Sequence, residues 1–223
     1  MRQIILDTET TGLLTEAGHR IIEIGCVELV NRRLTGNHFH RYINPEREIE
    51  REALEVHGIT SDFLQDKPIF HKVAQEFFEF VQGAELIAHN APFDIGFVNH
   101  EFKLCEFDIQ DIAEHCPVFD TLILARRLHP GQRNTLDALC KRYHVEHFNR
   151  EWHGALLDAE ILAQVYLAMT GGQATLFAEG LSEESSEKKT TAKQRKAKKI
   201  ERAPLKVIYA TAEELAAHER FSK

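Results

Sequence analysis

The sequence has no long apolar run. No stretch of about eighteen apolar residues passes without a charge, and the first fifteen residues hold only short apolar runs such as Ile4–Leu6. A secretory signal needs an apolar segment behind a basic start. We therefore expect neither a signal peptide nor a membrane span, and we expect a cytoplasmic location.

Cysteine is sparse and scattered. No Cys-x-x-Cys pair occurs among the four cysteines, which are Cys26, Cys105, Cys116 and Cys140. This spacing argues against a zinc knuckle and against a disulfide framework, and it favours a reducing compartment.

Positive charge is scarce outside one segment. The formal net charge is -8, yet residues 188–206 hold nine Lys or Arg and one acid, whereas residues 1–187 hold 16 basic and 31 acidic residues. Nonspecific affinity for nucleic acid comes from Lys and Arg, so the acidic body should hold DNA weakly by itself. Divalent cations on clustered carboxylates would reverse the sign locally.

The order of the predicted elements indicates an α/β fold. Strand patterns at residues 2–7, 21–30 and 38–43 predict an antiparallel meander. Short strands are then expected at 86–88 and 118–120, and helices at 49–57, 69–82, 94–104, 122–128, 134–143 (capped by Asn134) and 156–169. Strands followed by alternating helices and strands predict a mixed sheet with flanking helices.

After residue 172 the composition changes. The chain becomes polar and acidic and then basic, with almost no large apolar residue, which is typical of a flexible linker. Beyond Pro204 a strand-like run and a capping box at Thr211–Glu214 predict a small ordered element, too short to bury a core alone. We therefore predict a domain at residues 1–172, a flexible linker at 173–203 and a partner-binding segment at 204–223.

Two acids at the end of the first predicted strand are candidates for a metal site. Asp7 and Glu9 are two residues apart, so both carboxylates face one side of the strand. A solvated strand end is the alternative. Asp94 follows the buried strand at 86–88, at the kind of position where open α/β sheets bind ligands, and its alternative is a helix N-cap.

Asp158 opens the last predicted helix, and His153 precedes it by five residues. Residues five apart on a helix differ by about 140° in direction, so His153 could reach Asp158 only from a flexible segment before the helix, which Gly154 permits. Packing beside Trp152 is the alternative. An imidazole next to metal-bound carboxylates commonly acts as a general base.

Together these motifs resemble a known family. Asp7-x-Glu9, His89-Asn90-x-x-x-Asp94 and His153-x-x-x-x-Asp158 are similar in order and spacing to the DEDDh exonucleases, which are named for four acids and one histidine. From Arg2 to about Gln173 the sequence is similar to the proofreading (epsilon) subunits of bacterial DNA polymerase III. The resemblance implies a ribonuclease H-like fold and a 3′ to 5′ exonuclease that removes mismatched nucleotides from nascent DNA.

The resemblance also implies how the site is used. The site would hold two divalent ions. Because their ligands would be oxygen atoms and the substrate is a phosphate ester, the ions would be Mg²⁺ or Mn²⁺ rather than zinc. Asp7 would bridge both ions, Glu9 and Asp158 would hold the ion that carries the attacking water, and Asp94 would help to position the second. His153 would take the proton of the water.

Glu52 and His57 would, by the same resemblance, contact the terminal nucleotide together with Asp7, Glu9 and Asp158. An exposed helix face is the alternative for the Glu52 and His57 positions.

Two segments resemble attachment points for partners. Residues 173–177 are similar to the Gln-x-x-Leu-Phe pentapeptide that binds the sliding clamp (beta), with Leu176 and Phe177 as apolar anchors and Gln173 as an amide contact; a chance helix extension is the alternative. Residues 204–223 resemble the segment that binds the catalytic (alpha) subunit of DNA polymerase III. Binding of a small accessory (theta) subunit is left open by the sequence. The role of the basic run is also open, because it either touches DNA or keeps the tether soluble.

Two other functions stay open from the sequence. A 3′ to 5′ exoribonuclease of the same fold would carry the same acids, and a noncatalytic adaptor between polymerase and clamp would carry inherited ones.

Overall fold

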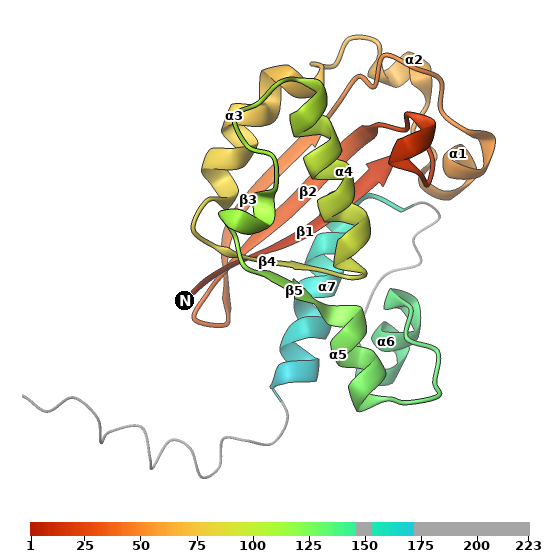
Figure 1. Cartoon of the computed structure of the whole chain (residues 1–223). Coiled ribbons are helices and arrows are strands. Elements are labelled where there is room, and N and C mark those ends of the chain that lie inside the picture. Colours follow the sequence, from red (N-terminus) through yellow and green to blue (C-terminus); the bar gives the residue numbers. More distant parts are fainter. Residues whose placement is uncertain (146–152, 172–223) are drawn as a thin grey trace, which may run out of the picture. The chain divides into compact units, whose positions relative to one another are not determined.

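A five-stranded mixed sheet forms the centre of the computed structural model, which describes residues 1–145 and 153–171 (Figure 1). The strands, in chain order, are β1 (Arg2–Thr10), β2 (Ile21–Val30), β3 (Arg33–Tyr42), β4 (Glu85–Ala88) and β5 (Val118–Asp120). They lie in the order β3-β2-β1-β4-β5. The first three pair antiparallel, and β4 is parallel to β1 and to β5, so the expected meander and mixed sheet are confirmed.

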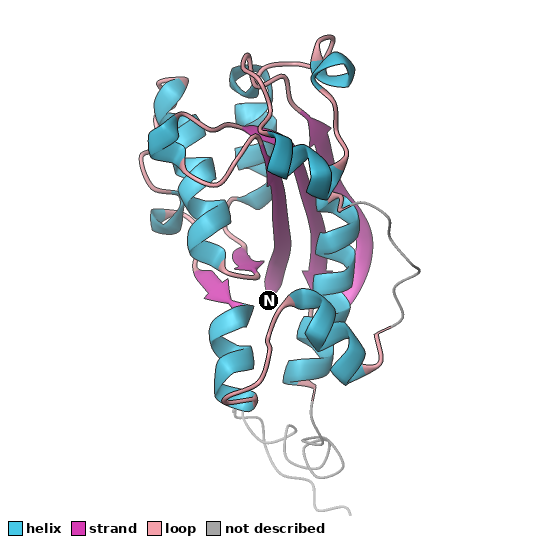
Figure 2. Ribbon diagram, turned by 90° about the vertical axis from the view of Figure 1, so that its right-hand side faces the viewer, coloured by secondary structure: helices cyan, strands magenta, loops and turns pink. Residues whose placement is uncertain are grey.

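Helices cover both faces of this sheet (Figure 2). The three longest helices are α3 (Phe70–Val81), α4 (Ala91–Leu104) and α7 (Ala155–Thr170). Ile4 and Leu6 of β1 pack with α3 and α4, whereas Ile5 packs with α7 on the other face. Because side chains alternate along a strand, each residue of β1 is assigned to the α4 side or to the α7 side.

The remaining helices are shorter. They are α1 (Arg51–His57), α2 (Ser61–Leu64), α5 (Thr121–Leu128) and α6 (Leu136–Tyr143), with 3-10 turns η1 (Thr15–Ala17) and η2 (Ile112–Glu114). α5 and α6 pack against α7 through Ala125, Leu139 and Val165. The sequence did not predict α2 or the two 3-10 turns, because one turn of helix is too short to show an apolar period.

The start of α6 differs from the prediction that Asn134 is its cap. Thr135 is the N-cap, and its Oγ1 accepts a hydrogen bond from the Ala138 N–H. The Asn134 amide instead donates to the carbonyls of His129 and Gln132. Asn134 therefore closes the loop before the helix, and the adjacent threonine takes the capping role.

The start of α4 also differs from the prediction. The helix begins at Ala91, three residues before Asp94, and Asn90 occupies the N-cap position with a φ of 71°. Pro92 lies inside the first turn, where its missing N–H would have had no intrahelical partner. Asp94 is consequently not the N-cap, and that alternative for it is wrong.

Arg20 and Glu101 form an ion pair that ties the start of β2 to α4. Arg20 Nε and Nη2 donate to the two carboxylate oxygens over 2.9 and 2.7 Å, and the Ile21 N–H donates to the same group over 3.0 Å. Glu101 is 1% exposed. Its hydrogen bonds raise the pKa of Arg20 further above the ordinary value.

Replacing Glu101 by alanine is expected to lower the free energy of unfolding by about 3 to 5 kcal/mol, because the Arg20 guanidinium loses its partner in a half-buried position. Urea unfolding measures the loss. The matched control is Glu55→Ala, which breaks the exposed Arg51–Glu55 pair and should cost less than about 1 kcal/mol. Similar losses for the two variants would contradict the structural role of Glu101.

Membrane spans, disulfides and a C-terminal linker were also considered in the sequence predictions. None of the helices in the described ranges is both long and apolar enough to span a bilayer. All four cysteines lie in the described part and are free thiols, so the expectation of no disulfide framework is confirmed. The linker predicted at 173–203 and the segment predicted at 204–223 lie outside the described residues.

Candidate active site

The carboxyl end of β1 supplies two of the predicted acids. β1 continues to Thr10, past the strand end predicted at Asp7, so Glu9 is still part of the strand. Ile5 packs with α7, and the alternation therefore directs Asp7 and Glu9 toward α7 and Thr8 toward α4. This places both acids on the sheet face from which the last helix approaches.

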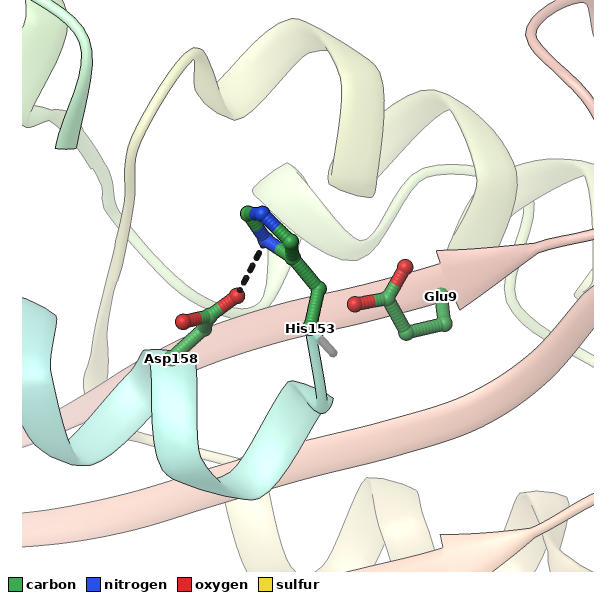
Figure 3. A group of neighbouring side chains, drawn as sticks. All are labelled: Glu9, His153 and Asp158. Carbon is green, nitrogen blue, oxygen red and sulfur yellow. Dashed lines mark hydrogen bonds and ion pairs between the residues drawn. The ribbon is translucent and has the colours of Figure 1, made fainter. Parts of the chain in front are cut away.

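Glu9, His153 and Asp158 form a compact group (Figure 3). One potential ligand atom from each residue lies within 4.8 Å of the others. Glu9 projects from β1, while His153 and Asp158 come from the start of α7 and the residues just before it. His153 Nδ1 is 3.0 Å from Asp158 Oδ2, so His153 does reach Asp158 from the segment ahead of the helix.

Asp94 reaches β1 from α4. Its Oδ1 accepts a hydrogen bond of 2.8 Å from Thr8 Oγ1, and its side chain is 3% exposed. Asp7 lies opposite Gly25 of β2. Within the described ranges, Asp7 and Asp94 are not members of the compact three-residue group, so the structure joins three of the five predicted catalytic positions directly and attaches Asp94 to the same strand through Thr8.

Burial changes the acidity of Asp94. Loss of solvent raises its pKa from the ordinary 3.8 to about 7, against the opposing effect of the hydrogen bond from Thr8, and the negative charge of Asp120 raises it further. A buried carboxyl with this pKa keeps its proton in much of the population at neutral pH. A cation at this site would therefore have to displace a proton.

A mainly apolar cavity of about 360 Å³ opens beside Glu9. Leu13, Val56 and Phe93 supply apolar walls, and Glu52 and His57 line the same cavity. The two residues predicted from the resemblance are thus brought to one cavity next to the acids. Glu52 is exposed, whereas His57 is buried, so the alternative of an exposed helix face fails for His57.

His57 is less basic than an ordinary histidine. Burial lowers its pKa, with partial compensation from the charge of Glu23 and the nearby Thr10 carbonyl. Its Nδ1 accepts a hydrogen bond of 3.0 Å from the Ile59 N–H, which assigns the proton of the neutral ring to Nε2. Among the described residues Nε2 makes no hydrogen bond of ordinary geometry; the Thr10 carbonyl is its nearby acceptor, and the atom is fully buried.

Comparison with known proteins decides the family. Residues 4–166 match the model of the RNase_T family, described as exonuclease. The chain is 53% identical to the DNA polymerase III subunit epsilon of Escherichia coli (strain K12), over 98% of this chain and 90% of that protein. It is 49% identical to the subunit of the same name from Rickettsia typhi, over 99% and 95%. The chain belongs to the epsilon-subunit family.

A solved structure agrees with this assignment. Exonuclease X in complex with 5′ overhanging duplex DNA is 26% identical to the chain, with a TM-score of 0.56 over 77% of this chain and 92% of that one. The ribonuclease H-like fold predicted from the sequence is therefore confirmed. This member of the epsilon-subunit family is a 3′ to 5′ DNA exonuclease.

Some residues of this epsilon-family site were not predicted from the sequence. Thr8 lies between the two acids of the first motif, and strict alternation along β1 would have directed it toward Asp94. Leu13, Val56 and Phe93 come from three separate segments, and nothing in their local patterns indicates a shared cavity. Glu23 of β2 also contacts the start of α7.

Metal binding by this epsilon-family protein is expected to release protons below about pH 7. Carboxylate ligands bind a cation in the ionised form, so affinity for Mn²⁺ should rise by up to about tenfold per pH unit between pH 5.5 and 7 and then level off. Since the folded pKa of Asp94 exceeds its unfolded value, the contribution of this group to the stability of the metal-free protein is present below pH 4 and lost as the pH rises toward 7.

Calorimetric titration with Mn²⁺ in two buffers of different ionisation enthalpy measures this proton release. Thr8→Val, which removes the hydrogen bond that lowers the Asp94 pKa, should move the same dependence to higher pH. Binding with no proton release at pH 6 would contradict the expectation that the cation displaces a proton from Asp94.

Proposed function

We propose that the protein removes mismatched nucleotides from the 3′ end of nascent DNA by two-metal-ion hydrolysis, as the proofreading subunit of the DNA polymerase III core. The compact group of Glu9, His153 and Asp158 beside an apolar cavity carries this proposal. The reaction needs carboxylates that bind cations, an imidazole that accepts a proton, and a cavity that holds the base of the terminal nucleotide.

The residues at the site fit divalent cations that prefer oxygen. Glu9 and Asp158 bring carboxylates from two elements to one point. Asp94 is hydrogen-bonded to Thr8, the neighbour of Glu9 on β1, in a buried position whose raised pKa a cation would lower. Asp7 and Glu9 face the same side of β1. Two bound ions would stabilise the charge on the attacking and leaving oxygens of the phosphodiester. We assign Glu9 and Asp158 to one ion, Asp94 to the other, and Asp7 to both.

His153 is the proton acceptor in this proposal. When Nδ1 carries the proton that is shared with Asp158 Oδ2, the ring is oriented and Nε2 is the basic nitrogen. The imidazole is half-buried, in a position that a water molecule can reach. Asp158 would therefore both contribute to the metal site and fix the tautomer of His153.

The cavity beside Glu9 suits the terminal nucleotide. Apolar walls from Leu13 and Phe93 offer a surface on which a base freed from its pair can pack. In this proposal the Glu52 carboxylate accepts a hydrogen bond from the 3′ hydroxyl, and the Nε2–H of His57, whose Nδ1 is occupied by the Ile59 N–H, donates one to it. A mismatched end frays more readily than a paired one, because unpairing it costs less. Preference for mismatches then follows from the need to separate the end before it enters.

Nucleotide release tests this function. The substrates are a DNA primer with a mismatched 3′ end, the same primer with a paired end, and a matching RNA oligomer, each with Mg²⁺ or Mn²⁺ and with chelator. We expect metal-dependent release in the order mismatched DNA, paired DNA, RNA. Preference for RNA would make the exoribonuclease alternative correct, and no release from any substrate would support the adaptor alternative.

We further propose that the part of the chain after residue 171 attaches this domain to its partners. Residues 204–223 would bind the catalytic (alpha) subunit, and Gln173, Leu176 and Phe177 would bind the sliding clamp (beta). The acidic body is expected to hold DNA weakly, and attachment through its own chain would keep the nuclease near the primer end at roughly millimolar effective concentration. A small accessory (theta) subunit is compatible with this arrangement.

Replacing Leu176 and Phe177 by alanine is expected to weaken clamp binding at least about tenfold, because both apolar anchors are lost. Surface plasmon resonance with immobilised clamp measures the effect. Release of nucleotides from a free primer should stay unchanged, since the catalytic residues are untouched. Unchanged clamp affinity would rule out the pentapeptide as the binding site.

A further inference from the structure

A buried glutamate of β2 contacts the start of the helix that carries His153 and Asp158. Glu23 lies opposite Glu9 in the β1–β2 pairing, and its side chain is 2% exposed. Its Oε2 accepts a hydrogen bond of 3.1 Å from the Ala155 N–H, the first residue of α7. Gly154, the N-cap residue of α7, makes no side-chain cap, so Glu23 takes that role from another element.

The second oxygen of Glu23 is also occupied. Oε1 lies 2.7 Å from His40 Nε2 on the adjacent strand β3. With one oxygen on His40 and the other on Ala155, the carboxylate spans from β3 to the helix start. Because both carboxylate oxygens are bound by groups of the protein, Glu23 connects the sheet to the start of α7.

Two further contacts hold the same short segment. Gly25, two residues from Glu23 on the same face of β2, is so close to α7 that a Cβ there would lie 2.2 Å from the Ala155 carbonyl carbon. The His153 N–H donates to the Val56 carbonyl of α1 over 3.2 Å. The segment from His153 to Ala155 is thus held by a carboxylate on one strand, by direct backbone contact with that strand, and by α1.

We propose that Glu23 is a positioning residue for hydrolysis: its hydrogen bond to the Ala155 N–H sets the start of α7, and through it the placement of His153 and Asp158 relative to Glu9. The proposal rests on the proposed roles of His153 and Asp158. An acceptor at this point fixes the axial position and rotation of the first turn. Displacement of reacting groups by about 1 Å costs about a hundredfold in rate, and loss of a residue that orients metal ligands costs about 10 to 100-fold.

The acceptor, not the charge, carries this role. Glutamine keeps a carbonyl oxygen that can accept from the Ala155 N–H and an amide group that can hydrogen-bond to the His40 ring, whereas alanine keeps neither. Glu28 of β2 provides the matched control, because it is also a carboxylate with hydrogen bonds, to Arg2 and Thr35, but lies on the same strand away from α7.

The experiment compares Glu23→Ala, Glu23→Gln and Glu28→Ala in the full chain. It measures kcat and KM for nucleotide release from a single-stranded DNA oligomer, thermal unfolding, and the imidazole resonances of His153 in nitrogen-edited NMR spectra. We expect Glu23→Ala to lower kcat about 10 to 100-fold with KM within about threefold. Glu23→Gln should restore kcat to within about threefold and return the His153 resonances toward their wild-type positions. Glu28→Ala should lose stability with kcat unchanged.

Two results would overturn the proposal. One is a Glu23→Ala protein that loses thermal stability but keeps its kcat and its His153 resonances, since Glu23 would then be structural only. The other is a Glu23→Gln protein as impaired as Glu23→Ala. If Glu23→Ala does not fold, His40→Ala removes another hydrogen bond of the same carboxylate and is expected to lower kcat by a few fold. An unchanged kcat would again count against the role. A wild-type protein without any release would instead refute the proposed function.

Discussion

The Asp158→Ala protein is expected to release nucleotides at least about a thousandfold more slowly than the wild type. The substitution removes a carboxylate from the compact group and the hydrogen-bond partner of His153 Nδ1, so one change affects both cation binding and the orientation of the proposed base. Loss of a single group that stabilises the transition state typically costs about 100 to 1,000-fold. Single-turnover kinetics on a 3′-labelled primer measures the loss.

Glu160→Ala is the matched control for Asp158. Glu160 lies on the same helix, two residues further along, and its side chain is exposed. Release by Glu160→Ala should stay within about twofold of the wild type, because exposed substitutions away from a site have small effects. A comparable loss in both variants would mean that the helix, not the Asp158 carboxylate, is what the reaction requires.

The Gly25→Ala protein is expected to lose about 3 kcal/mol of stability and at least about a hundredfold in kcat. The new methyl group would lie 2.2 Å from the Ala155 carbonyl carbon and from the Leu156 nitrogen. Both are backbone atoms that cannot turn away, so α7 must shift from β2, and His153 and Asp158 shift with it. Urea unfolding and single-turnover kinetics report the two effects.

Gly96→Ala is the corresponding control for an added methyl group. A Cβ at Gly96 in α4 would meet no atom within 4 Å, and alanine in a helix is favoured over glycine by about 0.5 to 1 kcal/mol. Gly96→Ala should therefore be as stable as the wild type or more so, with normal kcat. Normal activity of Gly25→Ala would show that the approach of α7 to β2 is not needed for catalysis.

Local patterns made much of the sheet and of the acid positions predictable. Alternation over Ile4, Leu6 and Ile5 identifies both faces of β1, and the same period places Asp7 and Glu9 together. His153 could be linked to Asp158 because the chain distance is short and Gly154 is flexible. These arguments need only neighbours along the chain.

Contacts between distant segments were not predictable in this way. Glu23 accepts a hydrogen bond from Ala155, which lies 132 positions further along the sequence. The sequence around a glutamate in an apolar strand does not indicate that its partner is the start of a helix. The cavity beside Glu9 likewise combines Leu13, Val56 and Phe93 from three segments. Thr135 rather than Asn134 caps α6 because the loop before the helix already uses the Asn134 amide. In each case contacts between distant segments determine which of several residues with similar local sequence patterns takes the role.

The proposed function requires that Asp7, Glu9, Asp94 and Asp158 hold two divalent ions beside His153. Anomalous diffraction from crystals of the protein with Mn²⁺ and a nucleoside monophosphate locates such ions. We expect two manganese peaks, with carboxylate oxygens of Glu9 and Asp158 on one, Asp94 on the other, Asp7 on both, and the sugar of the nucleotide in the cavity near Glu52 and His57. Manganese bound only elsewhere, or a single peak with Asp94 directed away from it, would refute the two-ion site.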